Sequence, residues 1–147
     1  MPILFMRRLN VISRCQNLFR VKHSQHLPCS CHHPFVFAIC RAPGRSQEEI
    51  AKDLCLNKST VTRALADLQA QGYVTRLPNP ADKRELLVYP TEKMAEALPR
   101  VRAVAQEFNT AVLSGIEQSE LDVFLSVLSR MEENARAAAY DAKEGAL

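Results

Sequence analysis

The sequence predicts a mainly helical protein that carries one small β-hairpin, and three observations support this fold class. Apolar residues recur at intervals of three and four over most of the 147 residues, as in amphipathic helices. Two short strand-like runs, 73–77 and 85–89, flank a single turn at 78–82. Hydrophobic residues make up 47% of the chain, which is enough for a core. The longest uncharged stretch holds four histidines and two prolines, so no membrane-spanning helix is predicted.

The first third of the chain predicts two helices separated by a break. Residues 3–22 place Phe5, Ile12, Cys15 and Phe19 on one face of an amphipathic helix. The apolar run 35–40 predicts a short buried helix that ends at Pro43 and Gly44. Cys15 and Cys40 lie on the apolar faces of these helices, where a free cysteine usually behaves as a small hydrophobe.

Two helices joined by a tight turn follow. Ser46 and Glu49 have the Ser-x-x-Glu spacing of a capping box, which begins a helix of about nine residues that stops near Cys55. Asn57 is placed to cap the next helix, and Gly72 is placed to end it. At 100° per residue, this second helix buries one sector and exposes the opposite one. The predicted buried residues are Val61, Ala64, Leu65 and Leu68.

The last third predicts two long helices behind the hairpin. Thr91 caps the first, which Pro99 should bend and Ser114-Gly115 should end, and 119–122 can cap the second. Apolar seams run through 94–111 and 121–138, and so small a chain has too few partners to bury both. The end of the chain is expected to fray after Tyr140.

Helix, tight turn, helix and hairpin is the order of a winged helix-turn-helix, whose second helix enters the DNA major groove. The guanidinium of Arg63 can reach guanine O6 and N7, and Arg84 at the wing tip would lie at the adjacent minor groove. Asp82 is expected to hold the wing loop or to orient Arg84. The alternative is a solvated polar face and turn. The predicted DNA-binding residues are Lys58, Ser59, Thr60, Thr62, Arg63, Lys83 and Arg84, with Asp82 as the wing-orienting residue.

The segments 44–54, 57–63, 71–74, 82–84 and 91–93 together resemble the MarR family of bacterial transcriptional regulators. The resemblance runs from about residue 34 to 135. It implies a homodimer built from the first and last two helices, a pseudo-palindromic operator of double-stranded DNA, and release by a small effector. It also assigns DNA contacts to Ser59, Thr60, Arg63 and Arg84. Three residues depart from the pattern: Cys55 replaces a frequent glycine, where a positive φ would be strained, Pro90 replaces a leucine and Met94 a glycine.

The leading hypothesis is therefore a cytoplasmic, dimeric repressor released by a phenolic or lipophilic effector, with no cofactor and no enzymatic activity. A second hypothesis is a metal- or thiol-sensing regulator using Cys29, Cys31, His32 and His33, with His23 or His26 nearby. A third is a winged-helix protein-interaction module without DNA binding. The expected domains are a dimerisation helix and loop at 1–33, a DNA-binding lobe at 34–90, a helical dimerisation region at 91–141 and a disordered tail at 142–147.

Charge is unevenly distributed along the chain. Residues 1–40 carry five Arg and Lys and no acidic residue, whereas 94–147 carry five basic and nine acidic residues. The acid-free amphipathic N-terminus also matches a mitochondrial presequence. This alternative is disfavoured because the dimer seams require the helix at 3–22 and the family is bacterial.

Overall fold

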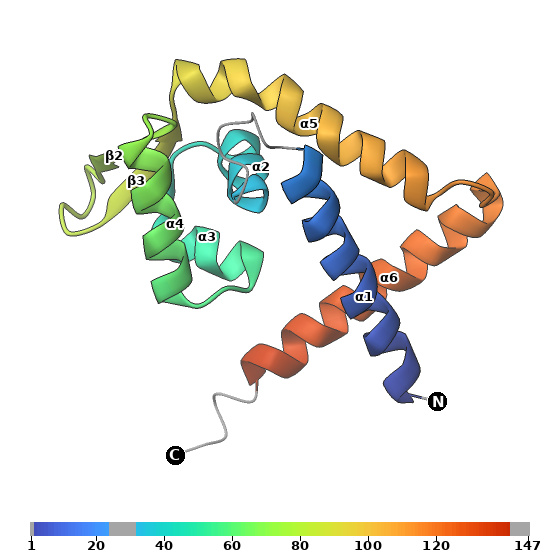
Figure 1. The fold of residues 1–147 in the computed structure, drawn as a ribbon. Coiled ribbons are helices and arrows are strands. Elements are labelled where there is room, and N and C mark those ends of the chain that lie inside the picture. The colour runs from blue at the N-terminus through green and yellow to red at the C-terminus, as the bar shows by residue number, and fades with distance from the viewer. Residues whose placement is uncertain (1, 24–31, 142–147) are drawn as a thin grey trace. The chain divides into compact units, whose positions relative to one another are not determined.

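The computed structural model describes residues 2–23 and 32–141, and within them the chain is mainly helical (Figure 1). It divides into two compact units, Met1–Asn109 and Thr110–Leu147. No helix in the described ranges has both the length and the apolarity needed to span a bilayer. The elements are α1 (Pro2–His23), α2 (His33–Arg41), β1 (Arg45–Ser46), α3 (Gln47–Leu54), α4 (Lys58–Ala70), β2 (Val74–Pro78), β3 (Leu86–Pro90), α5 (Glu92–Val112) and α6 (Gln118–Asp141).

The predicted helices are present, and α3, α4 and α5 begin at their predicted caps. Ser46 Oγ accepts a hydrogen bond from the Glu49 amide at 3.2 Å, and Glu49 Oε2 accepts one from the Ser46 amide at 2.7 Å, which completes the capping box of α3. Asn57 Oδ1 caps α4 by accepting from the Thr60 amide at 2.8 Å. Thr91 Oγ1 accepts from the Met94 amide at 3.3 Å at the start of α5. Local hydrogen-bonding chemistry thus sets these three boundaries.

The sheet has one more strand than the sequence predicts. Its order is β1-β3-β2 and all pairs are antiparallel, with Arg45 opposite Val88 and Arg76 also opposite Val88 on the other side. The hairpin prediction is therefore right for β2 and β3 but misses β1, because a two-residue strand is too short to show alternation. Gly44 precedes β1 with φ +83°, and a Cβ there would lie 3.1 Å from the Tyr89 ring.

The turn between α3 and α4 contains a strained residue. Cys55 has φ +52° and is the only described residue other than glycine with a positive φ. It forms the left-handed end of α3, where its amide bonds back to the Ala51 and Lys52 carbonyls. The strain expected for a cysteine in place of glycine is thus present.

The core lies among the helix-turn-helix, α2, the sheet and the first half of α5. α2 packs against α3 and β3, and α4 packs against α3 and β2. Met94, one of the departures from the family pattern, is fully buried in this core. The other buried apolar residues are Phe35, Val36, Ala38, Ile39, Ile50, Val61, Ala64, Leu65, Leu68, Tyr73, Val74, Val88, Ala97 and Val101.

The second unit contains the end of α5 and α6. The predicted cap at 119–122 needs correction, because α6 already begins at Gln118 and the Glu120 carboxylate accepts from the Glu117 amide at 3.1 Å. The capping group is thus a carboxylate that reaches back from inside the first turn. Among the described side chains of α6 none is fully buried within the single chain, and the exposed large apolar residues include Val123, Phe124, Leu125 and Val127.

Candidate nucleic-acid interface

The two faces of α4 are divided as the helical angle predicts. Val61, Ala64, Leu65 and Leu68 are buried in the core. The opposite face presents polar and cationic groups to solvent: Lys58, Ser59, Thr62 and Arg63 are exposed, and Thr60 is partly exposed. Packing of the apolar sector against α3 and β2 thus fixes which side chains can reach another molecule.

Two hydroxyls at the start of α4 are engaged within the protein. Ser59 Oγ donates to Asn57 Oδ1 at 2.9 Å. Thr62 Oγ1 donates to the Lys58 carbonyl at 2.8 Å and accepts from Gln47 Nε2 at 2.5 Å. A phosphate oxygen only accepts hydrogen bonds, so either hydroxyl must give up its present acceptor before it can donate to DNA. Among the exposed donors on this face, Arg63 has the longest reach and the guanidinium geometry suited to a base edge.

Gln47 belongs to this surface, although the sequence did not single it out. It is the first residue of α3, and its amide group connects that helix to α4 through Thr62. Its position directly after a capping serine was visible in the sequence. The hydrogen bond that it donates to Thr62, fifteen residues further along the chain, was not visible in the sequence.

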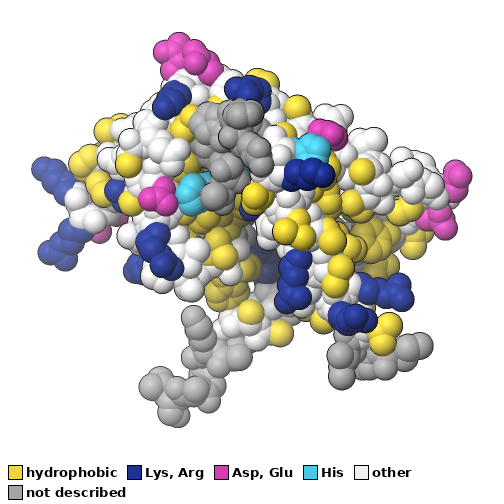
Figure 2. Space-filling model, in the orientation of Figure 1, with side chains coloured by type: hydrophobic (Ala, Val, Ile, Leu, Met, Phe, Trp, Pro, Cys, Tyr) yellow, Lys and Arg dark blue, Asp and Glu magenta, His cyan; other side chains and the backbone are white. Residues whose placement is uncertain are grey.

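The wing loop is held by hydrogen bonds of Asp82 and Asn79. Asp82 Oδ1 accepts from the Arg84 backbone amide at 3.0 Å, and Asn79 Nδ2 donates to Glu85 Oε2 at 2.6 Å. Of the two roles expected for Asp82, this backbone contact corresponds to the one that holds the loop. Lys83 and Arg84 remain exposed beyond it, and Figure 2 shows Lys and Arg side chains projecting at the left edge, where Figure 1 places the wing.

A cleft of about 400 Å³ separates the wing from the two helix starts. Lys58 and Arg84 contribute cationic groups to it, while Glu48, Asp82 and Glu85 contribute carboxylates. Because these carboxylates repel negative charge, the cleft favours an anion only next to Lys58 and Arg84. The remaining lining residues are Ser46, Gln47 and Leu86.

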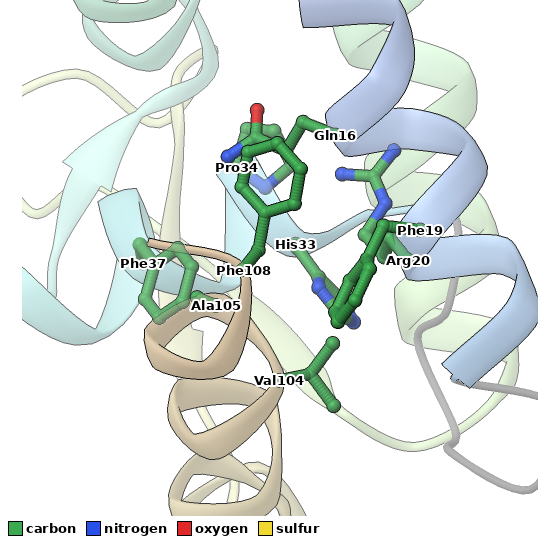
Figure 3. A pocket seen from close by; sticks show the side chains of 9 residues that line it. All are labelled: Gln16, Phe19, Arg20, His33, Pro34, Phe37, Val104, Ala105 and Phe108. Carbon is green, nitrogen blue, oxygen red and sulfur yellow. The ribbon is translucent and has the colours of Figure 1, made fainter. Parts of the chain in front are cut away.

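A second cavity, of about 220 Å³, lies between α1, α2 and α5 within the first unit (Figure 3). Its lining is mainly apolar, and Phe19 and Phe108 approach each other there with ring centroids 5.4 Å apart. His23 stacks on Phe19 at 3.9 Å beside the pocket, and its Nδ1 lies 3.9 Å from Glu107 Oε1. The lining residues are Gln16, Phe19, Arg20, His33, Pro34, Phe37, Val104, Ala105 and Phe108.

His33 provides a buried polar group in this pocket. Burial, with a smaller contribution from the Arg20 charge, lowers the pKa of His33 to about 4. The imidazole is therefore neutral at pH 7. Its side-chain Nε2 is buried and has no hydrogen-bond partner among the described residues.

The proposed Cys and His ligand set lies partly outside the described residues, which exclude Cys29, Cys31 and His26. Within the described part, His32 and His33 have different surroundings: His32 Nε2 lies 3.4 Å from Asp67 Oδ2, and His33 lines the pocket. No group of three or more potential metal ligands occurs in the ranges that the structure describes. The metal and thiol hypothesis gains no support from this geometry.

The described cysteines differ in environment. Cys40 is half-buried, and burial raises its pKa even though the Arg102 charge opposes this effect. It thus fits the predicted role of a small hydrophobe. Cys15 is exposed in the single chain.

A buried helix-turn-helix core, an outward polar face on α4 and a cationic wing define the winged-helix class. The profile of the MarR family matches residues 30–85. The uncharacterized HTH-type transcriptional regulator YybA of Bacillus subtilis strain 168 is 28% identical over 100 residues, which cover 68% of this chain and 67% of YybA. In sequence and in fold, the chain is thus similar to the MarR family of transcriptional regulators.

Solved structures share this fold. An uncharacterized SlyA-like transcription regulator from Listeria monocytogenes superposes with a TM-score of 0.89 at 23% identity, covering 96% of this chain and 95% of the other. A mutant of MarR from E. coli, solved in complex with operator DNA, gives a TM-score of 0.78 at 23% identity over 88% and 94% of the two chains. At this level of identity the structures establish the fold alone.

Proposed function

We propose that this protein is a dimeric, DNA-binding repressor that a small phenolic or lipophilic effector releases from its operator. The observation that carries the proposal is the outward face of α4 together with the exposed wing cations on the same lobe. Arg63 reads a base edge in the major groove, and Arg84 reaches the minor groove. Lys58, Thr60 and Lys83 add contacts to phosphates. The operator complex of the E. coli relative supports the same use of the fold.

Exposed apolar side chains support a homodimer. α1 exposes Leu4, Phe5, Val11 and Ile12, and α6 separately exposes Phe124 and its apolar neighbours. Apolar surfaces of this extent on a single chain usually mark protein interfaces. A second copy of the chain would cover them and would place two lobes on a pseudo-palindromic site, with half-sites about one helical turn apart.

The pocket between α1, α2 and α5 supports the proposed effector. Its volume of about 220 Å³ and its aromatic lining suit a small flat apolar molecule. The neutral imidazole of His33 provides a hydrogen-bonding group for a phenolic hydroxyl.

Selection of bound sequences from random DNA, followed by fluorescence anisotropy titrations, tests DNA binding. If the dimer makes roughly 6–10 phosphate contacts, affinity should fall ~10³–10⁵-fold between 50 and 200 mM salt. Arg63→Ala should cost about 1–3 kcal/mol on the selected site and relax the preference at one base position. Arg100→Ala, which removes an exposed arginine of α5, is the matched control and should bind normally.

Two results would count against the proposal. If Arg63→Ala binds the selected site as the wild type does, Arg63 does not read a base. If the wild type shows no salt-sensitive binding to any DNA, the lobe is a protein-interaction module. Sedimentation at the concentrations of the titrations tests the dimer independently.

A further inference from the structure

Two adjacent histidines at the start of α2 face different parts of the molecule. His33 lines the pocket, is 4% exposed, and has a buried Nε2 without a hydrogen-bond partner in the described ranges. An unsatisfied buried polar atom is costly, so an occupant that hydrogen-bonds it would bind more favourably than a purely apolar one. In Figure 3 its imidazole lies between Val104 and the side chains from α1.

His32 connects the same turn to the recognition helix. Its Nε2 lies 3.4 Å from Oδ2 of Asp67, one turn after Arg63 on the exposed side of α4. The His32 ring meets Phe35 edge-on, with centroids 6.1 Å apart and an interplanar angle of 82°. The His32 carbonyl accepts from the Val36 amide at 3.1 Å, so its backbone belongs to the first turn of α2.

The peptide bond between His33 and His32 and the contact between His32 and Asp67 together connect the pocket to α4. A rearrangement of the first turn of α2 that accommodates an occupant against His33 also moves His32, because the two residues are neighbours in the chain. The partner of His32 is a carboxylate on the helix that carries Arg63. A change in the His32–Asp67 contact would therefore act directly on the helix that carries Arg63.

We propose that the His32–His33 dipeptide couples the pocket to the recognition helix: His33 contacts the pocket occupant, and His32 transmits its presence to α4 through Asp67. This inference rests on the proposed function, since it assigns the regulation of the same pocket. His32 and Asp67 are positioning residues, and neither needs to touch the effector.

A double-mutant cycle tests the coupling without knowledge of the effector. Ala105→Phe places a ring in the pocket and serves as the occupant. It is combined with Asp67→Asn, which removes the carboxylate charge next to His32. Operator affinity is measured by anisotropy for the wild type, both single variants and the double variant. Circular dichroism melting checks each fold, and Ala105→Leu replaces Ala105→Phe if the larger side chain prevents folding.

We expect Ala105→Phe to weaken operator binding at least fivefold when Asp67 is present, and less than twofold in the Asp67→Asn background. His32→Gln should reduce the effect of pocket filling in the same way. Glu96→Gln, which neutralises an exposed carboxylate on α5, is the matched control and should leave the fivefold effect intact. Additive effects of Ala105→Phe and Asp67→Asn would overturn the coupling, as would unchanged operator binding by Ala105→Phe alone.

A measurement without DNA separates this proposal from the proposed function. Amide hydrogen exchange across 58–70 should accelerate on pocket filling when Asp67 is present, and should not respond in the Asp67→Asn background. If the wild type fails to bind DNA, the proposed function is refuted, while the exchange result still decides the coupling. Equal exchange in all four proteins would refute the coupling even if DNA binding is intact.

Discussion

Cys55 allows a test of backbone strain in the turn between α3 and α4. Its φ of +52° is unfavourable for an L-residue by about 1–2 kcal/mol, a cost that glycine does not carry. Glycine loses about 0.5–1 kcal/mol more backbone entropy on folding, which offsets part of the gain. The thiol donates a hydrogen bond to the Lys52 carbonyl at 3.7 Å, and because it is exposed its removal costs little packing. We expect Cys55→Gly to raise the free energy of unfolding by about 0.5–1 kcal/mol.

Urea unfolding at a fixed protein concentration measures this change, because the stability of a dimer depends on its concentration. In thermal unfolding at the same protein concentration, Tm should rise by about 1–4 °C, since 1 kcal/mol corresponds to about 2–4 °C for chains of this size. Cys55→Ala is the control, because it removes the thiol and keeps the strain, and it should show no gain. Equal stabilisation by alanine and glycine would assign the effect to the thiol. Destabilisation by glycine would refute the strain argument.

Three further substitutions test the fold and the pocket. Between about pH 6.5 and 4, the unfolded chain binds a proton at His33 that the folded protein does not. The free energy of unfolding should therefore fall by about 1–2 kcal/mol from pH 7 to pH 5. Urea titrations should show this pH dependence in the wild type and not in His33→Gln. Ser46→Ala removes one half of the capping box and should cost about 0.5–2 kcal/mol in the same assay, whereas an unchanged midpoint would show that the cap is dispensable. Gly44→Ala should cost about 1–2 kcal/mol, because its φ is +83° and its Cβ would lie 3.1 Å from the Tyr89 ring; a neutral result would mean that Tyr89 moves freely.

The sequence predicted which residues form the candidate interface better than it predicted the contacts that those residues make within the protein. The outward position of Arg63 and the exposure of Lys83 and Arg84 follow from helix period and turn position, and the structure agrees with both. That Thr62 is engaged by Gln47 did not follow, because the two residues lie fifteen positions apart and meet only after α3 packs on α4. Whether these side chains touch DNA stays a prediction.

By itself, the sequence determined the elements whose signals are local. Helix period, the Ser46 and Asn57 caps and the glycine after α4 act within about four residues, which is why the predicted helices and the buried face of α4 were right. Only the tertiary structure decided the rest. The strand β1, the His32–Asp67 contact, the neutral state of His33 and the pocket around it require segments far apart in the chain to pack together. Burial and long-range pairing, which control those features, leave no periodic trace in a single sequence.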